Sequence, residues 1–287
     1  MIGTISARRH RKDRLITRLS AFAVALALIP LGWILYDVAK IGLKAIRSVD
    51  FFTQGPPGDP SALGGGIWNG ILGTLIIVGL AAAIAVPLGV MSAVYLAEFA
   101  KPGSRLASVI RFFADVMSGI PSIVYGIFVY TLIVAATHSF SAWSGSVAIA
   151  LIVWPVVMRT TEEVLKLVPE ELRQASYALG APKWRTVVQV VLPAAGAGIL
   201  TGALLGLARG AGETAPLLFT AFGNQFVSSA LGKPMSALPL EIYRGARTAF
   251  DPAIQRAWGA ALTLIVMVLV LSVGARWLLG RRARALS

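Results

Sequence analysis

Two opposite charges lie four residues apart inside a long apolar stretch of this 287-residue chain. At that spacing Arg209 and Glu213 share one face of a helix, so their side chains can pair. Charges in such a stretch cost free energy and usually face a bundle interior or a water-filled cavity. A guanidinium group presents a planar fork of N–H donors that fits the oxygens of an oxyanion, and it stays charged at physiological pH. The pair is therefore either a site on the path of an anion, with Glu213 orienting Arg209, or a salt bridge that only fixes the helix.

Two hydroxyl side chains are further candidates for that path. Thr214 follows Glu213 directly and is followed by Ala215 and Pro216. Because proline has no N–H, we expect the helix to be kinked there and to expose backbone carbonyls. Ser122 lies in an earlier apolar stretch, although a serine in a membrane helix more often bonds to a neighbouring helix.

Glycines recur every four residues beside these charges. They are Gly198, Gly202, Gly206 and Gly210. One face of the helix then carries no side chains, and another helix backbone can approach it closely. We expect this face to be a helix packing seam.

A polar segment, residues 159–193, predicts two short helices outside the apolar stretches. Glu171 suits the positive end of the first helix, and Gly180 can end that helix in a left-handed cap. A Gly-Ala-Pro bend leads to the second helix, which we expect to stop before Pro193. The first helix carries a small apolar stripe, formed by Leu172, Ala175, Ala178 and Leu179. Such a pair can fit a groove on a partner or lie on a lipid surface.

The elements that must position these residues follow from composition. Of all residues, 56% are apolar and 14% are charged, and the mean hydropathy is +0.76. A bilayer core about 30 Å thick is crossed by about 20 apolar residues in a helix. Six apolar runs have this character, at residues 19–36, 71–96, 112–136, 142–158, 194–222 and 257–279. They lack the alternation of barrel strands. The predicted fold class is an all-α integral membrane protein with about six transmembrane helices.

The distribution of positive charge predicts the orientation. Most of the 26 Lys and Arg residues fall on the side of the N-terminus. By the positive-inside rule, both termini and the segment 159–193 are cytoplasmic. The basic excess is expected to bind membrane lipids, and no nucleic acid is needed to explain it. The first apolar run is longer than that of a signal peptide and no cleavage pattern follows it, so we expect it to stay as an anchor.

The predicted organisation has four parts. They are a basic cytoplasmic head at 1–18, the first transmembrane helix with an external loop at 19–66, a core domain of five transmembrane helices at 67–279, and a basic cytoplasmic tail at 280–287. Prolines and glycines between residues 50 and 66 are expected to prevent a persistent helix in the external loop.

The sequence also lacks the residues of several chemistries. It has no cysteine and two histidines, so we expect no metal site and no cofactor. No nucleophile, metal cluster or carboxylate pair converges, so we do not expect an enzyme. No Gly-x-x-x-x-Gly-Lys-Ser/Thr loop is found, so the chain cannot use nucleotide by itself.

The polar segment resembles the coupling loop of ABC importer permeases, the loop that docks on an ATPase subunit. The resemblance rests on Gln174-Ala175-Ser176, on Gly180, and on the closing Val-Val-Leu-Pro at residues 190–193. Gln174 stands where that family usually has Glu, and Ser176 where it usually has Ala. The implied coupling residues are Glu171, Gln174, Ala175, Ser176, Gly180, Leu192 and Pro193.

Three further segments are similar to the PstA-type permeases of phosphate importers. Residues 208–221 read ARGAGETAPLLFTA and are very similar to the signature of that family. Residues 119–126 (GIPSIVYG) and 238–243 (LPLEIY) also look like it. The similarity covers the second to sixth apolar runs, and the N-terminal head is uninformative.

This resemblance implies a fold, a function and partners. The fold would be that of a type I ABC importer permease in the cell inner membrane. The chain would form a phosphate path with a sister permease, while two copies of an ATPase subunit bind ATP and an external phosphate-binding protein delivers the substrate. A permease for another oxyanion, such as molybdate or sulfate, is the nearest alternative. A secondary transporter is a further one, but it leaves the docking-type loop unexplained.

Overall fold

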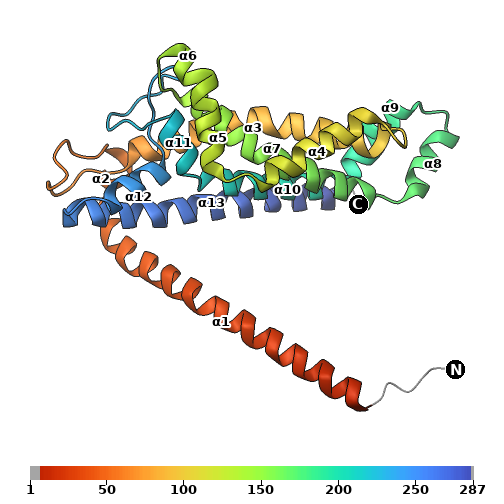
Figure 1. Cartoon of the computed structure of the whole chain (residues 1–287), viewed down its shortest axis with the longest axis horizontal. Coiled ribbons are helices and arrows are strands. Elements are labelled where there is room, and N and C mark those ends of the chain that lie inside the picture. The colour runs from red at the N-terminus through yellow and green to blue at the C-terminus, as the bar shows by residue number, and fades with distance from the viewer. Residues whose placement is uncertain (1–6, 286–287) are drawn as a thin grey trace.

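The chain is a bundle of long helices that run along one axis (Figure 1). The computed structural model describes residues 7–285, and side chains within residues 12–277. Across this range the regular structure is helical, apart from one isolated bridge between Phe222 and Met235. The predicted all-α class is confirmed. Of the predicted head (1–18) and tail (280–287), residues 1–6 and 286–287 lie outside the described residues.

Five helices are long and apolar enough to cross a membrane. They are α1 (Ala7–Ala45), α3 (Trp68–Val94) with its widened last turn η1 (Tyr95–Phe99), α7 (Ala142–Lys166), the helix over residues 183–211, and α13 (Asp251–Ala285). A bent pair counts as a sixth span if it is taken as one. The prediction of about six spans therefore agrees with the structure.

The third predicted span is not one continuous helix. It is divided into α4 (Arg105–Gly119) and α5 (Ser122–Val129), and the latter continues through η2 (Tyr130–Val134) into α6 (Ala135–Thr137). The two halves are bent by 110°. Pro121 causes the break, because it lacks an N–H and excludes the preceding Ile120 from helical geometry. Ile120 accordingly has ψ 134°.

The fifth predicted span is displaced toward the N-terminus. The second short helix does not stop before Pro193, as the sequence predicts, but runs from α9 (Lys183–Thr186) through η3 (Val187–Val191) into α10 (Leu192–Ala211). The widened turns of η3 precede the proline, whose ring would clash with a regular preceding turn. The expected interruption near Pro216 is found at residues 212–214, after which α11 (Ala215–Thr220) begins.

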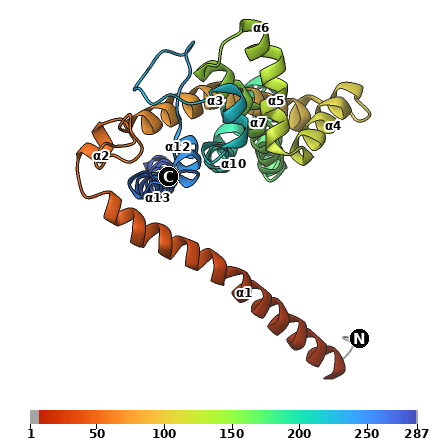
Figure 2. The ribbon, with the colours of Figure 1, turned by 60° about the vertical axis from the view of Figure 1, so that its left-hand side comes forward.

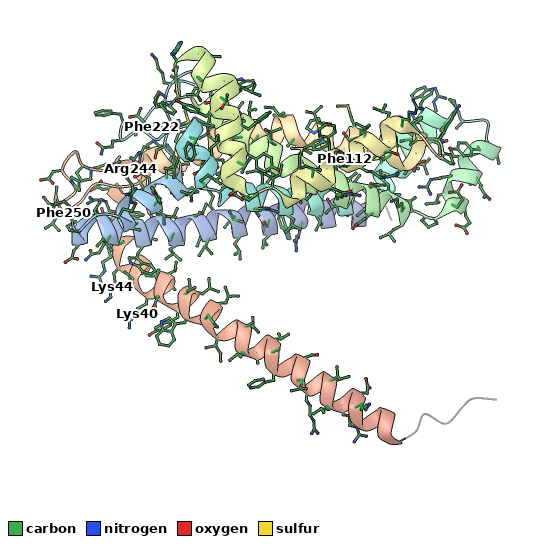
Figure 3. The ribbon with its side chains drawn as sticks, in the orientation of Figure 1. Lys40, Lys44, Phe112, Phe222, Arg244 and Phe250 are labelled. Carbon is green, nitrogen blue, oxygen red and sulfur yellow. The ribbon has the colours of Figure 1, made fainter. Side chains whose placement is uncertain are left out.

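Short helices cover both ends of the bundle. One end, here called the α12 end, carries α2 (Asp50–Thr53) and α12 (Leu238–Ala246). The opposite end, the α8 end, carries α8 (Glu170–Ala178) and α9 (Figure 1). The segment predicted as a loop at 50–66 thus begins with one helical turn. Figure 3 places Phe222, Arg244 and Phe250 at the α12 end, with Lys40 and Lys44 on the nearby part of α1.

Helix α1 diverges from the rest of the bundle, as the views in Figures 1 and 2 agree. It packs on α13 near its own C-terminal end, where Gly42 lies against Trp258 and Leu262. Residues 12–36 are exposed.

Helix α7 is the centre of the bundle, with α3 and α10 packed along it. The shared core includes Ile77 of α3, Ile149, Val153 and Val157 of α7, and Ala203 of α10. Glycines permit this packing: a Cβ at Gly210 would lie 2.9 Å from Ile149 and Val153, and one at Gly206 would lie 3.2 Å from Val153. Gly198 and Gly202 meet Val164 and Thr160 of the same helix.

We predict that Gly202→Val weakens the contact between α10 and α7. A Cβ at position 202 would overlap Thr160, so the helices must separate. Overpacking of this kind costs roughly 1–3 kcal/mol, which thermal unfolding of the purified protein would detect. Gly196→Val is the matched control, because no atom lies within 4 Å of a Cβ at that position on the same helix. Equal melting temperatures for the two variants would contradict the prediction that this glycine face packs closely against α7.

Candidate functional site

The two interrupted helices meet inside the bundle. Helix α5 packs against α11, and a Cβ added to Gly126 would lie 2.7 Å from the Cα of Pro216. The backbones therefore touch at a position where a side chain would not fit. This contact brings together segments 119–126 and 208–221, which are far apart in the sequence.

Arg209 lies in the last turn of α10, whereas Glu213 lies two residues beyond the end of that helix. The prediction that they share one helix face is therefore wrong, because the helix stops at Ala211, although the two side chains still pair. The Nε atom of Arg209 is 3.9 Å from Oε1 of Glu213, and the side chains are 55% and 17% exposed, respectively. At this distance they form an ion pair without a hydrogen bond. Within the described residues no acceptor bonds to the guanidinium group, so its N–H donors are available to a ligand.

The hydroxyl candidates flank the same interruptions. Ser122 is the first residue of α5, and Thr214 directly precedes α11. Neither hydroxyl has a hydrogen-bond partner in the part of the chain that the structure describes. Tyr125, which the sequence reading missed, donates its hydroxyl to the carbonyl of Met117 across the break between α4 and α5. It also lies within electrostatic range of Arg209.

The coupling-type loop has well-defined geometry. Gly180 has φ +82°, its N–H bonds to Tyr177 O at 2.9 Å, and the N–H of Ala181 bonds to Ser176 O at 3.2 Å. These two bonds form a Schellman motif with glycine at the left-handed position. The hydroxyl groups of Ser176 and Thr186 lie 2.8 Å apart and connect α8 to α9.

The remaining coupling candidates separate into two groups. Glu171, Gln174 and Ala175 are exposed on α8, whereas Leu192 and Pro193 lie in the first turn of α10. Large apolar side chains around the loop are also exposed: Leu172 by 43%, Leu179 by 90% and Trp184 by 57%. The α8 end thus presents an apolar surface.

Two buried carboxylates at the α8 end were not singled out from the sequence. Glu98 pairs with Arg173 at 2.8 Å, and Glu162 pairs with Arg111 and Lys166, each at 2.9 Å. A carboxylate just after an apolar run is a signal that could have found Glu98. Its partner could not be found that way, because Arg173 is 75 residues further along the chain.

At the α12 end, α12 is tied to the start of α3. Asn69 Nδ2 donates to Glu241 Oε1 at 2.8 Å, and Leu238 N donates to Thr74 Oγ1 at 2.8 Å. Glu241 also pairs with Arg244 at 3.6 Å. In the part of the chain that the structure describes, no group of three or more His, Cys, Asp or Glu side chains could hold a metal ion.

A bundle with interrupted apolar helices around an arginine, and a helical knob at one end, has the architecture of an ABC importer permease. The chain belongs to the family of binding-protein-dependent transport system inner membrane components, whose profile matches residues 85–286. It is thus a subunit of a transport system in a membrane.

Named relatives cover almost the whole chain. It is 43% identical to the phosphate transport system permease protein PstA of Yersinia pestis, over 96% of this chain and 92% of that protein. It is 41% identical to PstA 1 of Mycobacterium tuberculosis strain H37Rv, over 98% and 92%.

Solved structures support the fold alone. A chain of the MetNI methionine ABC transporter in an inward-facing conformation aligns with a TM-score of 0.54 at 19% identity, over 77% of this chain and 94% of that chain. A chain of a bacterial alginate ABC transporter, solved in complex with an alginate pentasaccharide-bound periplasmic protein, aligns with a TM-score of 0.58 at 14% identity. That match covers 92% of this chain and 93% of the other.

Proposed function

We propose that this chain is the permease subunit of an ATP-driven phosphate importer and forms the translocation path with a sister permease. The observation that carries the proposal is Arg209, whose guanidinium donors are free beside two interrupted helices. The likeness to PstA proteins supports phosphate as the substrate.

The chemistry of the site suits an oxyanion. The Arg209 fork can bind two oxygens at once. The N–H groups of Ser122 and Ile123, the first two residues of α5, lie at the positive end of the helix dipole, which favours an anion. The free hydroxyls of Ser122 and Thr214 supply further donors.

Glu213 favours phosphate over the rival oxyanions. At neutral pH phosphate carries one or two protons, whereas sulfate and molybdate carry none. An ionised carboxylate accepts hydrogen bonds and donates none, so Glu213 can bind a phosphate hydroxyl but repels an oxyanion without a proton. A pocket with such an acceptor can discriminate strongly between the two kinds of ligand.

The surfaces at the two ends of the bundle indicate which partner proteins would bind there. The exposed apolar side chains of the α8 end fit docking on a dimer of cytoplasmic ATPase subunits, which would bind the ATP. The α12 end would then face outward and receive phosphate from an external phosphate-binding protein. A secondary transporter would have no use for the docking knob. Uptake that continues without the ATPase would favour that alternative.

The first prediction concerns orientation, with the α8 end and both termini in the cytoplasm. The chain has no cysteine, so single cysteines at Ser61 and Lys101 can be labelled selectively. In intact cells a membrane-impermeant thiol reagent should label Ser61→Cys, and it should label Lys101→Cys only after permeabilisation. The reverse pattern would contradict the orientation.

The second prediction concerns coupling. Gly180→Leu should leave membrane insertion intact but abolish the stimulation of ATP hydrolysis by the binding protein. Leucine at positive φ is strained by about 1–2 kcal/mol, and its side chain projects into the open space that a docked ATPase would occupy. Gly64→Leu is the matched control, since Gly64 has the same φ of +82° and is equally open at the α12 end. Normal stimulation in the Gly180 variant would show that the loop does not couple.

The third prediction concerns the path. Arg209→Ala should lower phosphate uptake roughly ten- to hundredfold, as expected for losing hydrogen bonds to a charged ligand, while the complex still assembles. Arg209→Lys should rescue poorly because an ammonium lacks the planar fork. Glu213→Gln should impair transport more than assembly. Arg247→Ala is the control, because Arg247 bonds to Tyr243 on the exposed face of α12.

A double variant separates the path from a purely structural ion pair. If Arg209→Glu with Glu213→Arg transports phosphate at the native rate, Arg209 has no path role. A panel of phosphate, sulfate and molybdate with the reconstituted complex tests the substrate.

A further inference from the structure

Arg173 of α8 uses all of its hydrogen-bonding capacity. Nε and Nη2 donate to Glu98 Oε1 at 3.2 and 2.8 Å, and Nη2 donates to Leu165 O at 3.0 Å. Nη1 donates to Val168 O at 2.8 Å and to Glu170 Oε2 at 3.3 Å. A guanidinium group has five N–H donors, and these five bonds account for them.

Outside α8 itself, the partners come from two helices and from the residues that follow one of them. Glu98 lies in η1, the last turn of the helix that begins at Trp68. Leu165 is in the last turn of α7, and Val168 follows that helix. Helix α8 itself packs against α9 and η3, so the long Arg173 side chain is the part of α8 that reaches η1.

This cluster is buried, unlike most ion pairs at the end of a bundle. The side chains of Arg173 and Glu98 are 11% and 6% exposed. The hydrogen bond to Glu98 raises the pKa of Arg173 above its ordinary value, so the guanidinium group stays charged. Separating the two side chains would leave each buried charge uncompensated, which is strongly unfavourable. The pair therefore resists being pulled apart when α8 moves.

The link from α8 to the following helices consists of packing on α9 and η3, with no ion pair among the described residues. It passes through the Gly180 cap, and its side-chain connection is the contact between Ser176 and Thr186. When α8 is displaced, the angle between α8 and α9 can therefore change at Gly180. Glu98, which is bonded to Arg173, must move together with α8.

We propose that Arg173 is the positioning residue that joins the coupling helix α8 rigidly to the second span, so that α8, η1 and the end of α7 move as one body. The proposal rests on the coupling role of α8 described above. Helix α3 then extends the joint through the membrane. Its other end is bonded to α12 through Asn69 and Glu241 and through Thr74 and Leu238. Motion at the ATPase reaches the opposite face along α3, independently of the path along the chain into α10.

The test uses the assembled transporter, with spin labels on cysteines at Ala178 in α8 and Lys101 beside η1. In the native protein the distance between the labels should stay constant between the nucleotide-free and ATP-bound states. In Arg173→Lys, which keeps the charge but loses the fork, the distance should change on ATP binding. Stimulation of ATP hydrolysis by the binding protein should fall on the order of tenfold, with basal hydrolysis retained.

Two further variants keep the test decisive. Glu98→Gln retains an acceptor oxygen and should give a weaker form of the same defect. Arg185→Lys is the matched control, because Arg185 is exposed in the same loop and lies over the Trp184 ring. Its stimulation and label distance should remain native.

If the distance between the two labels in the native protein changed by several ångströms on ATP binding, the proposal of a rigid connection would be refuted. This result would hold even if Arg173→Lys failed to assemble. Native stimulation in both the Arg173 and Glu98 variants would also overturn it. If Gly180→Leu kept normal stimulation of ATP hydrolysis by the binding protein, the coupling role of the loop would be refuted instead. If the native complex took up no phosphate, the proposal that phosphate is the substrate would be refuted.

Discussion

Backbone hydrogen bonding in a medium without water is the constraint on which this structure depends. A bilayer offers no partner to a freed N–H or C=O group, so a span can be interrupted only where protein covers it. Among the described residues two spans are interrupted, at residues 120–121 and 212–214, and the helices that follow them, α5 and α11, pack against each other at Gly126 and Pro216. The Tyr125 hydroxyl takes up the carbonyl of Met117. The polar residues that we propose for the path lie beside these two interruptions.

The close approach of helices around α7 makes that arrangement possible. Glycines on α10 allow its backbone to lie against Ile149, Val153 and Thr160. Since lipid provides little hydrophobic driving force between helices, packing of small residues holds such a bundle together. Helix α10 is thereby held along α7, and Arg209 lies at its end.

Two arginine–glutamate pairs show how geometry separates roles. Arg209 in the last turn of α10 and Glu213 just beyond its end are 3.9 Å apart, and the arginine is 55% exposed with its donors free. Arg173 and Glu98 come from different helices, are buried, and leave no arginine donor unused. The first arrangement can bind and release a ligand, whereas the second can only transmit position. The same residue types thus suit a substrate path in one place and a mechanical joint in another.

Local chemistry let the sequence determine the class and most spans, and it indicated the residues that we propose for the path. Transfer of apolar side chains into lipid and the missing N–H of proline both act within a short segment, so the spans, the break near Pro216 and the Gly180 cap could be predicted. The break before Pro121 was missed because hydropathy averages over it, and Pro193 was wrongly expected to end a helix because a widened turn absorbs it. Tertiary structure alone decided that α5 meets α11 and that Glu98 finds Arg173. Those contacts join residues far apart in sequence, and their free energy depends on how whole helices pack, which no local pattern records.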